Sequence, residues 1–221
     1  MSEIKYMCFD IGGVANVRMP LEEVVSLGQQ YFGENFSSVK LKQMMFPIVE
    51  NTNQWREFQN GEISAQNYLG YALSAGGFPT NENNKILFRS LLEEWCGVPY
   101  QPVLDLVEKL KQDGYHTSVL SNNNEIMYNT PSAEIKNRVD VAISSHEIGR
   151  SKPHWEAYCI LLGKIKATTP GEVLLVDDKV ENIQAAKRYG LQGFHFRSKE
   201  LTQDVAFKEL RLFLLKSWFY F

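Results

Sequence analysis

The sequence has few cysteines, no long apolar run and little net charge. Each of these features excludes or disfavours a class of protein. Its three cysteines have no CxxC spacing, so we expect buried free thiols, as at Cys8 and Cys159, in a reducing compartment. No apolar run is long enough to cross a bilayer, and the first residues lack the apolar stretch of a signal peptide. The formal net charge of −3 argues against bulk attraction to nucleic acid or anionic lipid.

What remains is an ordinary globular composition, with 44% hydrophobic and 22% charged residues. A chain of 221 residues can fold as one domain or as a core with an inserted module. The four histidines have no paired metal-ligand spacing, so we interpret them as structural. We therefore expect a cytoplasmic protein without stable membrane association.

Short apolar runs and helical patterns alternate after residue 100. The strand-like runs, including one near the start of the chain, are 6–9, 115–120, 139–143, 173–176 and 193–196. The helical patterns between and after them are 102–112, 154–164, 180–189 and 201–216. This alternation predicts an α/β fold of the Rossmann-like type, a mostly parallel sheet covered by helices on both faces.

The segment between the first strand and residue 97 has a different pattern. Five helical stretches follow one another without a strand, at 21–32, 37–46, 51–59, 64–75 and 81–95. Such a run cannot belong to an alternating sheet. We therefore predict a Rossmann-like core of residues 1–15 and 97–221, interrupted by an inserted all-helical cap domain of residues 16–96.

Polar residues follow three of the predicted strands, at the sheet edge where open α/β sheets bind ligands. They are Asp10, Ser121 and the pair Asp177-Asp178. Each has an ordinary structural explanation, as a turn residue or a helix cap. Two adjacent carboxylates after a buried strand repel each other, however, and Mg²⁺ relieves that repulsion. Lys152, in a loop, is a solvated lysine or a partner for an anion.

The four elements resemble the motifs of the haloacid dehalogenase-like hydrolase superfamily, which occur in this order at such strand ends. The stretches that carry the resemblance are FDIGGV, VLSNNN, EIGRSKPHWEAY and LLVDDKVENIQAA. The resemblance implies that Asp10 is the nucleophile, forming an aspartyl-phosphate. It also implies that Ser121 and the backbone amide of Asn122 hold phosphoryl oxygens, and that Lys152 neutralises the charge of nucleophile and phosphate.

The same resemblance implies a Mg²⁺ site. Asp10 and Asp178 would bind the ion directly, and Gly12 would offer its backbone carbonyl. Asp177 would bind through water or orient Lys152. The metal and the lysine would then stabilise the transferring phosphoryl group, a mainly electrostatic task.

The sequence departs from the family's phosphatases at Gly12, where they usually have a second aspartate that acts as general acid and base. General acid–base catalysis is worth roughly 10²–10⁴-fold. We therefore expect a preference for good leaving groups, as in acyl phosphates or sugar 1-phosphates. Glycine at this position also occurs in the superfamily's sugar-1-phosphate phosphatase-like members.

Three functions remain open at this point. The first is a Mg²⁺-dependent phosphatase of a small phosphorylated metabolite. The second is a catalytically weak or inactive binding protein on the same fold, suggested by Gly12. The third is a 2-haloacid dehalogenase, a branch that lacks an acidic pair at the fourth motif, so Asp177-Asp178 argue against it.

A few other residues are candidates for contacts. Trp55 and Arg56 are the cap residues that could face the site, although a core tryptophan and a surface arginine explain them as well. His146 and Arg150 flank the loop of Lys152 and could approach a phosphate, but we favour structural roles. The aromatic end, 218–221, is expected to pack on the core, with a homodimer or peripheral membrane contact as the alternative.

Overall fold

Five parallel strands form the central sheet in the computed structural model, which describes residues 3–218. Their order is β7-β6-β1-β8-β9. The strands are β1 (Tyr6–Phe9), β6 (His116–Ser121), β7 (Val141–Ser144), β8 (Val173–Asp177) and β9 (Gln192–His195). Phe9 pairs with Val119 on one side and with Val176 on the other. The carboxyl ends of the three central strands therefore lie level at one edge.

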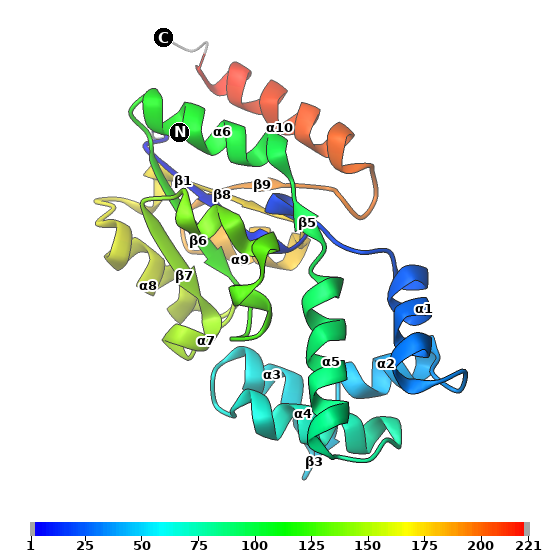
Figure 1. Cartoon of the computed structure of the whole chain (residues 1–221). Helices are drawn as coiled ribbons and strands as arrows, with labels where there is room; N and C mark the ends of the chain where they lie inside the picture. Colours follow the sequence, from blue (N-terminus) through cyan, green and yellow to red (C-terminus); the bar gives the residue numbers. More distant parts are fainter. Residues whose placement is uncertain (1–2, 219–221) are drawn as a thin grey trace.

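Helices cover both faces of this sheet, as the alternating pattern predicts (Figure 1). Side chains alternate along β1: Met7 and Phe9 pack with α6 (Gln101–Gln112) and α10 (Gln203–Trp218). Cys8 points to the opposite face and packs with α8 (Trp155–Ile165) and α9 (Val180–Arg188). Because both faces are buried, the central strands β1 and β8 consist of apolar residues up to the closing Asp177.

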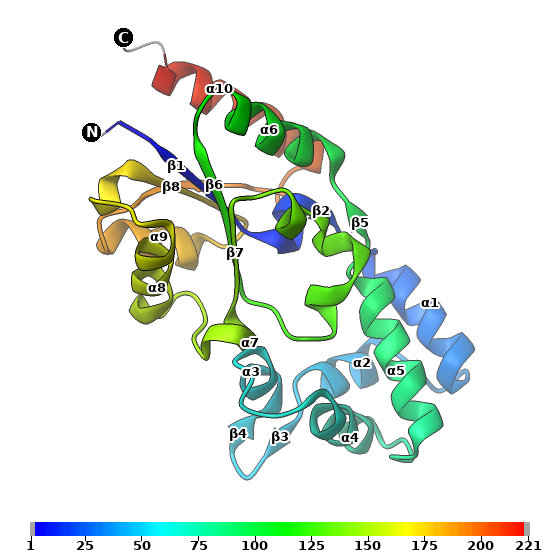
Figure 2. The same ribbon diagram turned by 60° about the vertical axis from the view of Figure 1, so that its left-hand side comes forward.

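The inserted segment forms a second layer of packing beside the carboxyl edge of the sheet (Figures 1 and 2). Its helices are α1 (Leu21–Phe32), α2 (Ser38–Met45), α3 (Gln54–Gln59), α4 (Ala65–Gly76) and α5 (Glu82–Trp95). Their apolar faces meet in a core of their own, with Phe36, Tyr68 and Phe88 fully buried. That this segment acts as a separate cap domain stays a prediction.

The chain passes twice between the two parts, and the two passes pair with each other. β2 (Asn16–Val17) lies antiparallel to β5 (Val98–Pro99). Asn16 strengthens the junction, because its amide donates to the Cys96 carbonyl at 2.9 Å and its oxygen accepts from Gly13 N at 2.8 Å. The pairing lies at the boundaries predicted from the sequence, after residue 15 and near residue 97.

The insertion differs in one detail from the sequence prediction. The helix predicted over 51–59 begins only at Gln54, because Asn53 caps it and a short hairpin precedes it, β3 (Ile48–Val49) with β4 (Thr52–Asn53). Glu50 and Asn51 have positive φ angles in the turn of that hairpin. The insertion is therefore helical except for this hairpin. Between β6 and β7, short 3₁₀ helices lie at Met127–Asn129 and Pro131–Asn137.

The prediction of a buried thiol was wrong for Cys159 and right for Cys8. Cys159 lies one helical turn from Trp155, which is exposed, on the outer face of α8. The buried face of that helix presents Ala157, Tyr158 and Leu161 to the sheet. The aromatic end predicted to pack on the core or to make contacts lies outside the described residues, apart from the backbone of Trp218. No helix within residues 3–218 has the length and apolarity to cross a membrane.

Candidate active site at the carboxyl edge of the sheet

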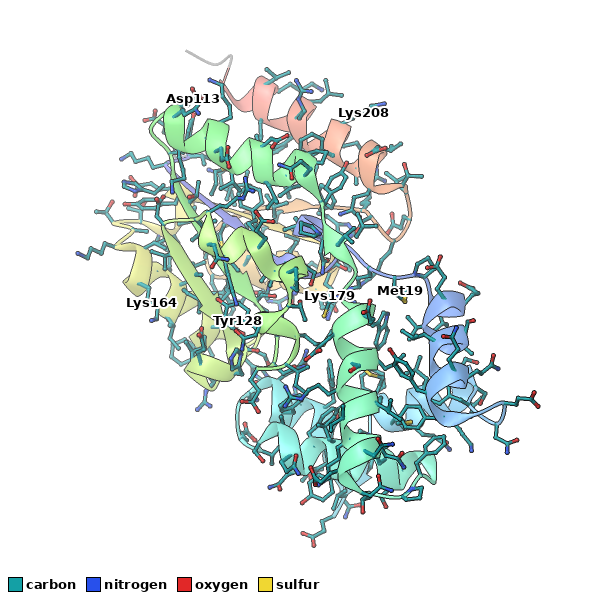
Figure 3. All side chains as sticks on the ribbon, viewed as in Figure 1. Met19, Asp113, Tyr128, Lys164, Lys179 and Lys208 are labelled. Carbon is teal, nitrogen blue, oxygen red and sulfur yellow. The ribbon has the colours of Figure 1, made fainter. Side chains whose placement is uncertain are left out.

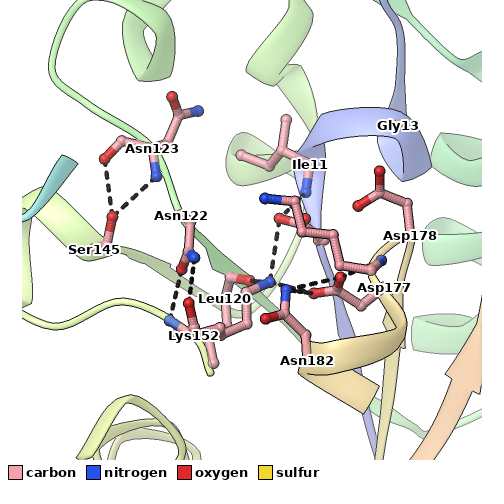
Figure 4. A network of polar contacts seen from close by, with 12 residues as sticks. Ile11, Gly13, Leu120, Asn122, Asn123, Ser145, Lys152, Asp177, Asp178 and Asn182 are labelled. Carbon is pink, nitrogen blue, oxygen red and sulfur yellow. Dashed lines mark hydrogen bonds and ion pairs between the residues drawn. The ribbon is translucent and has the colours of Figure 1, made fainter. Parts of the chain in front are cut away.

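The side chain of Lys152 lies at the centre of a buried polar network beneath the strand ends. Its ammonium nitrogen is 2.6 Å from Asp177 Oδ2 and 3.3 Å from Asp10 Oδ1, and it also donates to the Leu120 carbonyl. The side chains of Lys152 and Asp177 are 0% exposed. The structure thus brings together three residues that the sequence placed on different strands and loops. Figure 4 shows Lys152 beside Asp177.

The loop that carries Lys152 is held to the end of β6 by Asn122. The Asn122 amide donates to the Lys152 carbonyl at 2.6 Å, and the Lys152 backbone N donates to Asn122 Oδ1 at 2.7 Å. This pair of bonds resembles a step of strand pairing made by a side chain. The sequence predicted only the backbone amide of Asn122 as a phosphate ligand and missed its side chain, which positions the lysine.

Asp177 has partners for both of its carboxylate oxygens. Besides Lys152, it accepts hydrogen bonds from the Asn182 amide at 2.9 and 3.0 Å and from Lys179 backbone N at 2.9 Å. Asn182 lies in the first turn of α9, five residues after Asp177, so the helix points it back at the carboxylate. Two roles were expected for Asp177, binding Mg²⁺ through water or orienting Lys152. The geometry matches the second role.

Asp10 ends β1 and faces the same network from the next strand. Burial opposes ionisation of its carboxyl, yet the charge of Lys152 and a hydrogen bond from Ser121 outweigh burial and lower its pKa. Ile11 backbone N also donates to Asp10 Oδ1 at 2.8 Å. Burial likewise opposes the charge of Lys152, but Asp10 and Asp177 together raise the pKa of its ammonium. Asp10 is therefore held as an anion and Lys152 as a cation.

Asp178 differs from its neighbour because its side chain is buried without hydrogen bonds. Within residues 3–218, neither of its carboxylate oxygens has a hydrogen-bond partner. Lys199 approaches from the solvent side and forms an ion pair at 2.9 Å to Oδ2, outside hydrogen-bond geometry. Figure 4 shows the carboxylate of Asp178 standing apart from the dashed network. One carboxylate oxygen each of Asp10, Asp177 and Asp178 lies within 4.8 Å of the others.

Gly13 makes room for this carboxylate. Its φ of +77° is one that residues with side chains rarely adopt. A Cβ there would also lie 2.9 Å from Asp178 Oδ2, which is too close. The second glycine of the first motif thus lets the first and last motifs approach each other.

A cavity of about 190 Å³ opens between the strand ends and the inserted segment. Asp10, Gly12, Ser121 and Asn122 line its floor. Four apolar side chains of the insertion line the opposite wall: Met45, Phe46, Trp55 and Trp95. In Figure 3, Met19 and Lys179 mark the level at which the sheet and the insertion meet. The arrangement offers an ionic floor for a charged group and an apolar wall for an organic one.

The other residues proposed from the sequence as possible contacts differ in whether they face the cavity. Trp55 faces the cavity and also packs against Tyr68, with ring centroids 5.6 Å apart. Arg56 instead contacts His154 at 3.3 Å on the outside. His146 bonds to Ser144 at 2.6 Å, and burial lowers the pKa of its imidazole.

Arg150 forms an ion pair with Glu156 at 3.7 Å, and neither it nor His146 lines the cavity. Both therefore have structural contacts, as we expected.

Three polar residues near the site had no signal that we recognised in the sequence. Asn182 could have been found, because a polar residue five positions after Asp177 falls on the first turn of the following helix. Lys179 and Arg18 both line the cavity. Arg18 could not have been found, because it follows a loop whose course the sequence does not reveal.

Comparison with known proteins identifies the family, because residues 4–190 match the family model of haloacid dehalogenase-like hydrolases. The chain belongs to this family. It is 26% identical over 199 residues to the sesquiterpene phosphatase astK of Aspergillus oryzae, covering 86% of this chain and 89% of that protein. The resemblance carried by the four motifs is thereby confirmed.

Solved structures of this hydrolase family share the fold. A family enzyme of Bacteroides thetaiotaomicron in complex with magnesium and inorganic phosphate is 18% identical, with a TM-score of 0.68, covering 91% of this chain and 98% of that one. The L-2-haloacid dehalogenase of Xanthobacter autotrophicus, with chloropropionic acid covalently bound, is also 18% identical, with a TM-score of 0.62, covering 91% and 80%. Because the fold hosts both proteins, the reaction has to be argued from the site.

Proposed function

We propose that this hydrolase is a Mg²⁺-dependent phosphatase that acts on a small phosphorylated metabolite through an aspartyl-phosphate on Asp10. The observation that carries the proposal is the cluster of three buried carboxylates around a single buried lysine. A dehalogenase needs the nucleophile and a cation but not the acidic pair Asp177-Asp178. The curated relative named as a phosphatase supports the same choice.

The carboxylates fit a divalent cation. Asp178 is nearly fully buried, and its oxygens have no hydrogen bond within the described chain and only the exposed Lys199 as an ion-pair partner, a costly state unless a ligand uses them. Asp10 and Asp178, with the Gly12 carbonyl, would hold Mg²⁺, while Asp177 remains engaged with Lys152. When bound, the ion would neutralise charge on the phosphoryl oxygens, which lets an anionic nucleophile approach them.

The residues of the chain itself supply the other steps. Lys152 and Ser121 hold the Asp10 carboxylate in one orientation and keep it ionised, ready to attack phosphorus. Ser121 and the Asn122 backbone amide, at the cavity floor, would bind phosphoryl oxygens. The insertion closes the cavity from above and limits access of water.

The apolar wall narrows the organic part of the substrate. Trp55 and Trp95 can pack against an acyl chain or against the apolar face of a sugar ring, which keeps both expected classes open. The relative is named for a sesquiterpene, a hydrocarbon skeleton, which supports an apolar organic group. We therefore add a terpenyl phosphate to acyl phosphates and sugar 1-phosphates as the substrates to compare.

The test is turnover of p-nitrophenyl phosphate, acetyl phosphate, glucose 1-phosphate and farnesyl phosphate with and without Mg²⁺. We expect Mg²⁺-dependent release of phosphate that Asp10→Asn lowers by at least about 10³-fold. Asp105→Asn, an exposed carboxyl change on α6, is the matched control and should retain full activity. Absence of Mg²⁺-dependent turnover across the panel would favour the inactive binding protein instead.

A further inference from the structure

The space above Gly12 is occupied by the side chain of Arg18. Gly12 has φ −65° and ψ 112°, angles that any residue can adopt, in contrast to Gly13. A Cβ at position 12 would nevertheless lie 2.1 Å from Arg18 Nη2 and 3.1 Å from its Cζ. The group that a side chain at position 12 would meet is therefore the mobile end of Arg18 and not the backbone.

The backbone of Arg18 is anchored at the junction of the two parts of the molecule. It directly follows β2, and Met19 N donates to the Trp95 carbonyl at 3.4 Å. Gly97 packs so closely that a Cβ there would lie 2.9 Å from Arg18 Cα. The side chain thus extends from a fixed point back over the first motif.

Arg18 is an exposed residue that lines the same cavity as Asp10 and Ser121, and within residues 3–218 its guanidinium forms no hydrogen bond or ion pair with another residue. Lys152 does not line that cavity, because its charge is engaged behind Asp10. A planar fork of N–H donors that is free in a cavity matches an oxyanion, which it can bind through two parallel hydrogen bonds.

We propose that Arg18 is a catalytic residue that binds the leaving group's oxygen as an anion, in the space where a side chain at position 12 would lie. This rests on the proposed phosphatase function. Asp10 forms its bond to phosphorus while the bond to the leaving oxygen breaks, and the electron pair stays on that oxygen. Arginine does not give up its proton near neutral pH, so it stabilises the departing anion by charge. Water then cleaves the aspartyl-phosphate, and both of its protons leave with inorganic phosphate.

This role defines the substrate class more sharply. Leaving groups that depart as stable oxyanions, such as a carboxylate from an acyl phosphate or a phosphate from an organic diphosphate, match the guanidinium in charge and geometry. An alkyl alcohol would have to leave as a far more basic anion, which charge alone does not release, so simple alkyl phosphates should remain poor substrates. The apolar residues Trp95 and Phe46 across the cavity would contact the organic part of the same leaving group.

The kinetic test uses aryl phosphates whose leaving phenols range from dinitrophenol to unsubstituted phenol. Removing one donor from an oxyanion site typically costs about 10²–10³-fold. We expect Arg18→Ala to lower kcat/KM by about that factor for the poorest leaving group and much less for dinitrophenol, with Arg18→Lys intermediate. Arg89→Ala, an exposed arginine on α5, should change nothing. An equal loss across the series, or no loss, would overturn the proposal.

A double variant replaces the positive charge of Arg18 by a proton donor at position 12. In Gly12→Asp combined with Arg18→Ser, the carboxyl gains the space that the guanidinium leaves. We expect the double variant to cleave phenyl phosphate faster than Arg18→Ala does, with a pH dependence that the wild type lacks. Thermal unfolding of each variant separates these effects from misfolding.

A binding measurement makes the proposal independent of turnover. Benzoate, a carboxylate with an apolar ring, is titrated calorimetrically into the wild type and Arg18→Ala without substrate or metal. We expect at least about 10-fold weaker binding in the variant, the loss of one bidentate charged contact. If the wild type cleaves none of the phosphates, the proposed phosphatase function is wrong, but anion binding by Arg18 can still be measured. If benzoate binds both proteins with equal affinity, the proposed role of Arg18 is wrong.

Discussion

The two sides of the site are built in opposite ways. We call Lys152, Asp177, Asn182 and Asn122 the buried network, in which both carboxylate oxygens of Asp177 and the Lys152 ammonium are paired. The open side consists of Asp178, with no hydrogen bond, and Arg18, with no partner in the described chain. Asp10 lies between the two. The buried network holds the nucleophile in place, and the open side keeps its charges for ligands.

The largest effect is expected from Lys152→Met, which breaks the buried network. It leaves the carboxylates of Asp10 and Asp177 buried without their cation, so the free energy of unfolding should fall by about 3–5 kcal/mol and turnover should be lost. Urea denaturation measures the change. Lys109→Met, at an exposed ion pair on α6, should cost less than about 1 kcal/mol. Equal costs for the two variants would contradict a structural role of the network.

Asp178→Asn removes a charge from the open side. Since Asp178 has no hydrogen bond to lose, we expect the free energy of unfolding to stay the same within about 0.5 kcal/mol. Mg²⁺ affinity should fall by at least about 100-fold, because a carboxylate ligand is lost. Calorimetric titration with Mg²⁺ reads the affinity, and unchanged affinity would place the metal elsewhere.

Asn182→Ala tests a single member of the buried network. The variant removes two hydrogen bonds to Asp177 and leaves its carboxylate underbonded, at a cost of about 1–3 kcal/mol. Denaturation measures the stability, and Mg²⁺ titration should show a smaller change than in Asp178→Asn. A loss of Mg²⁺ affinity as large as that in Asp178→Asn would contradict the division of the site into a buried network and an open side.

Lys199→Ala should strengthen metal binding slightly. Its ammonium competes with a cation for Asp178 Oδ2, but the side chain is 58% exposed, so the gain should be only a few-fold. Lys208→Ala, on the exposed face of α10, is the matched control. Weaker Mg²⁺ binding in Lys199→Ala would mean that the lysine supports the site instead of competing for it.

The smallest effect concerns pH. Because the pKa of Asp10 is lowered, its carboxylate loses its charge only at a pH below the ordinary pKa of an aspartate. Because the pKa of Lys152 is raised, its ammonium loses its charge only at a pH above the ordinary pKa of a lysine. Neither titrates between about pH 5 and about pH 9. With Gly12 and Arg18 in place of a titrating acid, kcat/KM for p-nitrophenyl phosphate should be flat over that range. A bell-shaped profile would indicate a general acid on the open side.

Sequence patterns located much of the buried network. Short apolar runs marked the strands, and polar residues directly after them were expected to meet at one edge, because parallel strands point the same way. That argument placed Asp10, Ser121 and Asp177 correctly beside one another. The separate prediction that Cys159 is buried was wrong, because membership of a helix does not say which face the residue is on.

The sequence pattern predicted less of the open side than of the buried network. Gly12 was interpreted as the loss of an acid, but in the structure the guanidinium of Arg18 lies in the same space. Arg18 reaches it only because β2 pairs with β5 and Gly97 fixes where the backbone turns. Such a contact depends on two loops at once, and no local periodicity records it.

By itself, the sequence determined the order of the motifs along the chain, the identity of the carboxylates and lysine, and the interruption of the core by helices. These follow from local hydrophobicity and from the geometry of parallel strands. Only the tertiary structure decided which charges are satisfied and which stay open, because that depends on how residues distant in the chain approach within a few ångströms. Asp177 and Asp178 are adjacent and chemically identical, and burial among different neighbours gives them different roles.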